Sequence, residues 1–92
     1  MAYMVSHLWR NGTRNQYQEA LAKVHPASGL PKGQIYHAAG ITDDGVLIFT
    51  VWDSKESLDT FIKDVMIPSK ELPGGFVGVP EEIKAESINI QH

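Results

Sequence analysis

Apolar and polar residues alternate in the first segment of the chain, residues 2–9, with the two-residue period of a β-strand. One face of this predicted strand carries Tyr3, Val5, His7 and Trp9. After the turn signal Asn11–Gly12, apolar residues recur at helical spacing, at Tyr17, Ala20, Leu21 and Val24. Thr13 and Gln16 form a capping-box pattern and Pro26 stops the pattern, so a helix is predicted from Thr13 to about His25.

A second strand-and-helix unit follows after a loop. Residues 34–41 and 46–52 are β-forming runs separated by the turn residues Thr42 to Gly45, which predicts a hairpin. A second helix is expected to begin at Asp53–Ser54, with Glu56 closing a capping box on Asp53, and to end or kink at Pro68. Its apolar stripe is Leu58, Phe61, Ile62, Val65 and Met66. The Pro- and Gly-rich residues 73–80 are expected to form a mobile lid or a dimer contact, and residues 84–90 a last strand.

The order β-α-β-β-α-β predicts a single α+β domain over residues 1–92 with a ferredoxin-like fold. Right-handed crossovers arrange the strands as one antiparallel sheet of order 4-1-3-2, with both helices on one face. A four-residue hairpin loop from Thr42 to Gly45 places His37 opposite Thr50. A two-residue loop at Asp44–Gly45 places it opposite Trp52 instead, and a three-residue loop would swap the faces of one strand.

The hairpin registers that preserve the faces predict what each face of the sheet carries. We expect the helices to cover the face with small and apolar residues, which are Tyr36, Ala38, Gly40, Leu47, Phe49 and Val51. The other face would then lie bare, with Tyr3, Val5, His7, Trp9, Ile35, His37, Ile48, Thr50 and Trp52. That face is too apolar to remain in water as one patch, so a second subunit is expected to cover it.

Composition narrows the possible partners and the compartment. A chain of 92 residues buries a modest fraction of its surface by folding alone, which favours a homodimer. The net charge is -3 and the eight Lys and Arg are scattered, so nucleic acid is not an expected partner. Cysteine is absent, which excludes disulfides and thiolate sites. With no membrane-length apolar run and no signal-peptide pattern, we expect a cytoplasmic protein that does not interact with membranes.

The element order and the segment from Asp44 to Phe61, in which a strand ends in Trp52-Asp53-Ser54 and enters the second helix, resemble the dimeric α+β barrel superfamily. The resemblance is strongest to small proteins of the antibiotic-biosynthesis monooxygenase type. It implies a homodimer whose two sheets pack face to face, with a pocket in each subunit between sheet and helices or at the sheet face. Members of the superfamily include cofactor-independent oxygenases acting on polyketide quinols, haem-degrading enzymes and isomerases.

The haem-degrading branch can be compared at three positions. It uses an Asn, a Trp and an iron-ligating His at places that hold His7, Phe61 and Glu71 here. The missing axial His argues most strongly against haem, and no cofactor is expected. A metal site shared by His7 and His37 is also disfavoured, because their rings start roughly 10 Å apart, two strand spacings.

Cofactor-independent oxygenation requires a general base, a polar donor for the resulting anion and an apolar cavity that admits oxygen. His37 or His7 can act as the base, and Thr50, Tyr3 or Trp9 as the donor. Tyr3, Trp9, Trp52 and Phe61 are the candidates for contact with a small apolar or aromatic ligand. The alternative is a non-catalytic ligand-binding or assembly module in which both histidines are packed at the dimer interface. His25 and His92 are expected to be solvated.

Overall fold

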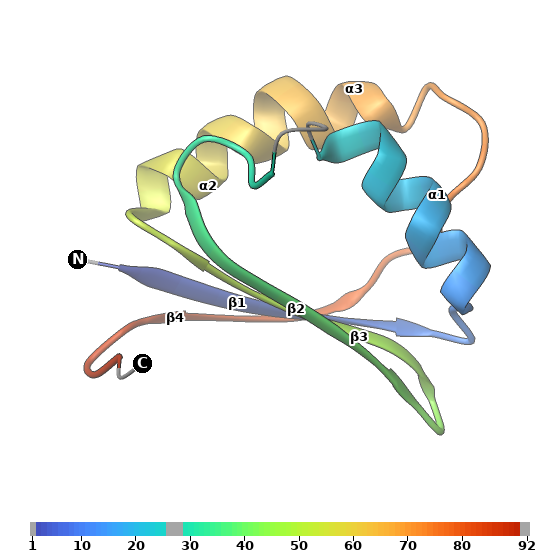
Figure 1. The fold of residues 1–92 in the computed structure, drawn as a ribbon, viewed down its shortest axis with the longest axis horizontal. Coiled ribbons are helices and arrows are strands. Elements are labelled where there is room, and N and C mark those ends of the chain that lie inside the picture. The colour runs from blue at the N-terminus through green and yellow to red at the C-terminus, as the bar shows by residue number, and fades with distance from the viewer. Residues whose placement is uncertain (1, 26–28, 91–92) are drawn as a thin grey trace.

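The computed structural model describes residues 2–25 and 29–90, which form one four-stranded sheet covered by helices. The elements, in chain order, are β1 (Tyr3–Arg10), α1 (Arg14–Val24), β2 (Gln34–Thr42), β3 (Gly45–Trp52), α2 (Lys55–Phe61), η1 (Ile62–Met66), α3 (Ile67–Ser69) and β4 (Glu81–Glu86). The sheet order is β2-β3-β1-β4 with antiparallel pairing, which is the predicted order read from the other edge. The helices lie on one side of the sheet (Figure 1), so the ferredoxin-like α+β fold is confirmed.

Helix α1 begins where the sequence predicts. The Thr13 hydroxyl accepts a hydrogen bond from the Gln16 backbone N–H at 3.1 Å, and the Gln16 side chain accepts one from the Thr13 N–H at 3.0 Å. This reciprocal capping box satisfies two backbone donors that the first turn leaves unpaired. The helix ends at Val24 with His25 as its C-cap, while Pro26 and His92 lie outside the described residues.

The second helix differs from the prediction at both ends. Its N-cap is Ser54, whose hydroxyl accepts from the Ser57 N–H at 3.1 Å, so the capping box expected on Asp53 does not form. After Phe61 the helix widens into the π-helical segment η1, closed by the bond from the Ile67 N–H to the Ile62 carbonyl. A widened turn accommodates Pro68, which has no N–H to donate and a bulky ring. The helical path therefore continues past Pro68 and ends at Ser69.

The β2–β3 hairpin has the register of the four-residue alternative. Ile41 pairs with Val46 and His37 with Thr50, and the chain reverses at Asp43–Asp44. Gly45 has a φ of 146°, and a Cβ there would lie 2.0 Å from the Trp9 carbonyl oxygen. Only glycine fits this close crossing of β3 and β1. A register shift between Gln34 and Tyr36 removes Ile35 from the alternation and leaves it 50% exposed.

The helices cover the face of the sheet that we expected to be bare. Val5 and Trp52, at 2% and 1% exposure, form the buried core with Leu58 and Phe61 of α2. The opposite side, called here the open face, carries the residues assigned to helix packing, and Tyr36 and Leu47 are 51% and 41% exposed there. The argument from small residues was wrong because burying the large ring of Trp52 beneath α2 removes more apolar surface from water than close packing on Ala38 and Gly40 would.

The last strand begins three residues earlier than predicted. β4 pairs with β1 from Tyr3 opposite Glu86 to Leu8 opposite Glu81. The apolar residues of 84–90 suggested a later strand, but pairing along β1 depends on the backbone rather than on apolar content. The observed strand is rich in Glu and Lys, which suits an exposed sheet edge because charged side chains oppose pairing with another chain.

Candidate functional site

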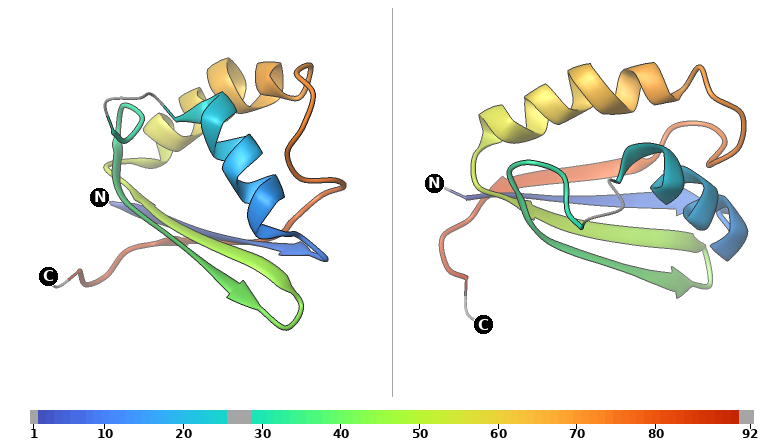
Figure 2. Two further views of the ribbon diagram at one scale, coloured as in Figure 1. Left: turned by 45° about the vertical axis from the view of Figure 1, so that its right-hand side comes forward. Right: turned by 45° about the horizontal axis from the view of Figure 1, so that its top comes forward.

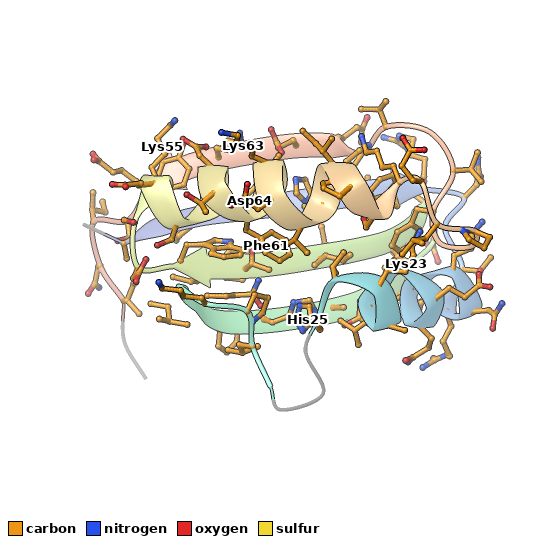
Figure 3. All side chains as sticks on the ribbon, turned by 90° about the horizontal axis from the view of Figure 1, so that it is seen from above. Lys23, His25, Lys55, Phe61, Lys63 and Asp64 are labelled. Carbon is orange, nitrogen blue, oxygen red and sulfur yellow. The ribbon has the colours of Figure 1, made fainter. Side chains whose placement is uncertain are left out.

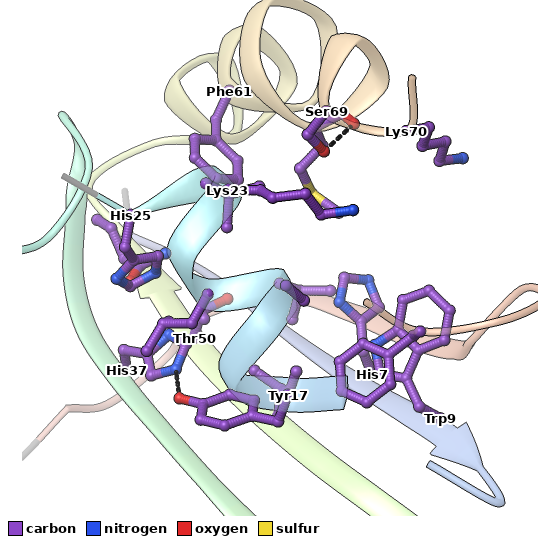
Figure 4. Close-up of a pocket in the computed structure, with 18 of the residues that line it drawn as sticks. His7, Trp9, Tyr17, Lys23, His25, His37, Thr50, Phe61, Ser69 and Lys70 are labelled. Atoms are coloured by element: carbon purple, nitrogen blue, oxygen red, sulfur yellow. Dashed lines mark hydrogen bonds between the residues drawn. The ribbon is translucent and has the colours of Figure 1, made fainter. Parts of the chain in front are cut away.

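A cavity of about 280 Å³ lies between the helices and the sheet (Figure 4). Its wall includes six of the seven residues predicted to form the site: His7, Trp9, His37, Thr50, Trp52 and Phe61. Tyr3 is not in the wall, and its side chain packs against the buried core instead. The predicted residues gather around a cavity because the helices cover the His37 face of the sheet.

His37 is bound by a helix residue that the sequence pattern did not single out. The Tyr17 hydroxyl of α1 and His37 Nε2 are 2.7 Å apart, within hydrogen-bond distance (Figure 4). The other ring nitrogen, Nδ1, is buried and has no hydrogen-bond partner among the described residues. Buried polar atoms are nearly always paired, so this unpaired nitrogen on a residue of the cavity wall is an exception that calls for an explanation.

His25 also lies against His37, contrary to the expectation that it is solvated. The two imidazole rings meet edge to face with their centroids 4.7 Å apart, and His25 is half-buried. Figure 3 shows His25 at the end of α1, beside β2. The sequence prediction failed because His25 follows the apolar stripe of α1, and only the angle of the helix to the sheet brings its ring over His37.

Burial sets the protonation states of this group. It lowers the pKa of His37, and it lowers the pKa of His25 with a further contribution from the charge of His37. Burial raises the pKa of the Tyr17 hydroxyl. At neutral pH the two imidazoles are therefore uncharged and the phenol keeps its proton, so His37 is in the form that accepts a proton.

His7 is held by Glu82, its partner on the neighbouring edge strand β4, from the same face of the sheet. Its Nε2 lies 2.6 Å from the Glu82 carboxylate, which Lys84 also approaches at 3.4 Å. Burial by itself would raise the pKa of Glu82, but the hydrogen bond from His7 and the charge of Lys84 outweigh it, so the pKa is lowered. The ionised carboxylate favours the proton on Nε2 and fixes the orientation of the His7 ring.

Thr50 and the tryptophans shape the wall between the two histidines. The Trp52 indole N–H donates to the Thr50 hydroxyl at 3.0 Å, which leaves the Thr50 proton free to donate to a ligand. The Trp52 ring packs against Phe61, with centroids 5.0 Å apart. Gln34, also in the wall, is buried and has no partner for Oε1 among the described residues. The wall is mainly apolar, with a few polar atoms that a ligand can satisfy.

The connector, residues 70–80, runs from the end of α3 to β4 (Figure 2), and five of its residues belong to the cavity wall: Lys70, Leu72, Gly74, Phe76 and Gly78. Phe76 stacks on Trp9 with ring centroids 4.6 Å apart and planes 8° from parallel. Lys23 Nζ donates to the carbonyl oxygens of Gly74 and Leu72 at 2.6 and 3.4 Å, and the Gly75 N–H donates to Glu19 at 3.4 Å. These bonds hold the connector to α1. Its predicted roles as a mobile lid or a dimer contact stay predictions.

The described part of the chain contains neither a metal-binding cluster nor a membrane-spanning helix. Within residues 2–25 and 29–90, no three His, Cys, Asp or Glu side chains are grouped so that they could hold a metal ion. No helix in these residues combines the length and apolar character needed to cross a membrane.

Two solved structures are similar to the chain over nearly its whole length. One, from Chloroflexus aurantiacus J-10-fl, is assigned as an antibiotic biosynthesis monooxygenase; the TM-score is 0.64 at 20% identity, covering 100% of this chain and 98% of the other. The second is the monooxygenase ActVA-Orf6 of Streptomyces coelicolor in complex with nanaomycin D, with a TM-score of 0.53, 16% identity and coverage of 99% and 90%. The chain has the fold of the antibiotic biosynthesis monooxygenases. At these identities the likeness establishes the fold and not the chemistry.

Sequence comparison adds nothing further. No protein-family model and no curated protein matches the chain. The fold implied by the element order and by the segment from Asp44 to Phe61 is thus confirmed through the structures, and the chemistry has to be argued from the cavity.

Proposed function

We propose that the chain is a cofactor-independent monooxygenase that acts on a planar aromatic substrate, with His37 as the general base. One observation carries the proposal: an uncharged histidine with a buried, unpartnered ring nitrogen is part of the wall of a ligand-sized, mainly apolar cavity. The bound small molecule in the Streptomyces monooxygenase of the same fold supports a small-molecule role.

The Tyr17–His37 pair defines how the base would work. In the tautomer whose Nε2–H donates to the Tyr17 oxygen, Nδ1 carries the free lone pair and accepts a proton from the substrate. The imidazolium formed is stabilised by the same bond to Tyr17. Because burial disfavours the charged ring, His37 returns the proton readily in a later step.

The reaction is balanced without a flavin, haem or metal. Loss of one proton from an acidic ring methylene gives a carbanion, which combines with O2 to form a C–O bond, and the distal peroxide oxygen takes the proton back from His37. Removal of the second methylene proton then breaks the O–O bond and leaves a carbonyl group and water. The substrate loses four electrons and O2 gains four. Thr50, which can donate a hydrogen bond, is the candidate for steadying the anion.

The alternative function is a non-catalytic ligand-binding module. Its assembly form required the His37 face to be used wholly in dimerisation, whereas in the structure the helices cover that face and a cavity remains. Ligand binding without turnover is therefore the competing hypothesis, and the two differ in whether O2 is consumed.

His37→Phe tests the proposal. With aromatic ketones and quinols as substrates, measured with an oxygen electrode, we expect this variant to lose at least about 100-fold in turnover, because a positioned base contributes about that much or more. Tyr36→Phe, on the next residue but on the open face, is the matched control and should leave turnover unchanged. Unaltered turnover in His37→Phe would refute the role of His37. Wild-type protein that binds these compounds without consuming O2 would favour the binding module.

We further propose that the open face pairs with a second copy of the chain. This face carries Met4, Leu8, Tyr36, Leu47, Phe49, Val51 and Ile83. Ile83 is 73% exposed and Tyr36 contacts Phe49 edge to face, so the patch is apolar and spans all four strands of the sheet. A patch of this kind on a small protein indicates association. The expected partner is the same as in the sequence prediction, but the contacting face is the opposite one.

A further inference from the structure

The cavity wall contains basic but no acidic side chains. Among the described residues that line it are two lysines and three histidines, and neither an Asp nor a Glu. Because His25 and His37 are uncharged at neutral pH, the two lysines supply the positive charge of the wall, whereas the whole chain has a net charge of -3. Glu82, the carboxylate on His7, lies beyond the wall. A cavity lined in this way attracts an anionic ligand.

Lys23 is the basic residue best placed to bind an anion. Its side chain is half-buried, and Nζ donates to two neutral acceptors, the carbonyl oxygens of Gly74 and Leu72. In the described part of the chain, no carboxylate lies within 4.0 Å of this nitrogen; Glu19, one turn earlier, instead accepts from the Gly75 N–H. An ammonium has three donors, so Lys23 retains one N–H for a ligand and makes no ion pair within 4.0 Å among the described residues.

The basic residues and the proposed base lie on different sides of the cavity. In Figure 4, Lys23 and Lys70 lie with Ser69 toward α3, whereas His37 and Tyr17 lie lower, against the sheet. Aromatic side chains also line the cavity: in Figure 4, Phe61 lies on the side of the helices and Trp9 lies beside His7 on the side of the sheet. A planar ligand with its anionic group at Lys23 would thus place its ring among apolar side chains near His37.

We propose that the substrate is an aromatic acid, whose carboxylate binds Lys23 with Lys70 at the rim while its ring system lies toward His37. The assignment of the reacting end rests on the proposed function. The assignment of the charged end is independent of the proposed function, because it follows from the two lysines and from the absence of Asp and Glu among the described residues of the wall. The carboxylate forms a charge-assisted hydrogen bond in a place partly removed from water, where such bonds are strongest.

The test compares two probes of the same shape, naphthoate and naphthamide, by isothermal titration calorimetry at low ionic strength. We expect naphthoate to bind about tenfold more tightly, because a hydrogen bond to a charged group contributes more than one between neutral groups. Lys23→Gln keeps a donor for the Gly74 carbonyl and removes the charge, so the preference should fall to about that of a neutral pair, within about threefold of unity. Lys63→Met, which removes an exposed lysine outside the cavity, is the control and should keep the full preference.

The outcomes separate this inference from the proposed function. Equal binding of the two probes, no binding of either, or a preference that survives in Lys23→Gln would overturn the assignment of the carboxylate site. Loss of the preference in Lys23→Gln together with intact naphthamide binding would support it, since the connector is then still in place. None of these measurements requires turnover. A protein that binds aromatic ketones and quinols without consuming O2, yet prefers naphthoate to naphthamide, would count against the oxygenase proposal while supporting the carboxylate site.

Discussion

The face of the sheet that the helices cover is more polar than the face that is exposed, which is the reverse of the usual arrangement. The face beneath the helices carries His7, His37 and Thr50 around a cavity, while the open face is a largely apolar surface formed by all four strands. Each of these three side chains makes one hydrogen bond: His7 with Glu82, His37 with Tyr17 and Thr50 with Trp52. Burial of polar groups is tolerated when they are hydrogen-bonded, and exposure of apolar ones when a partner covers them. The contrast is the basis of both proposals, a ligand for the covered face and a second copy of the chain for the open face.

The largest effect is expected when a charge is introduced into the open face. Phe49→Lys would bury an unpaired ammonium in the proposed dimer interface, which costs about 3–5 kcal/mol, so the dimer should dissociate at least about 100-fold more readily. Sedimentation velocity over a dilution series measures this. Thr60→Lys introduces the same charge on the exposed side of α2 and should leave association unchanged. A wild-type chain that is monomeric at every concentration would contradict the dimer.

A smaller effect is expected on the covered face. Tyr17→Phe removes the hydrogen bond that orients His37, and kcat/KM should fall about tenfold, the contribution of one hydrogen bond. The pH profile should change as well, because the imidazolium loses its acceptor and the acid limb moves to lower pH. Tyr3→Phe is the matched control, since Tyr3 lies outside the cavity wall. An unchanged profile in Tyr17→Phe would assign the hydroxyl a packing role only.

The smallest effect concerns stability and pH. The pKa values of His25 and His37 in the folded chain lie below their ordinary value of 6.5. Above pH 6.5 both histidines are therefore neutral in the folded and in the unfolded chain, and their burial does not reduce the free energy of unfolding through protonation. As the pH falls below 6.5 the unfolded chain takes up protons that the folded chain does not, and stability declines until the folded pKa values are reached. Urea unfolding at a series of pH values measures the slope. His25→Gln should flatten it, and a slope that is steeper in the variant would contradict the assignment.

The sequence predicted the elements well and the contacts between them poorly. The capping box at Thr13 follows from local chemistry and is present, and the pairing of His37 with Thr50 is one of the two face-preserving registers that the turn residues allowed. The N-cap of the second helix was placed one residue early because Asp53 and Ser54 are both good caps. Of the residues around His37, Tyr17 was interpreted as part of an apolar stripe and His25 as solvated. Nothing in the spacing of a helix indicates which strand its side chains will reach.

What the sequence determined by itself is which residues lie together on one face of the sheet, because a strand turns successive side chains to opposite sides whatever surrounds it. His7, His37, Thr50 and Trp52 share a face for that reason. Alternation is symmetrical, however, and does not say which face is inside. Only the tertiary structure decided that, when the helices packed on Val5 and Trp52 and brought Tyr17, Lys23 and His25 into the same cavity.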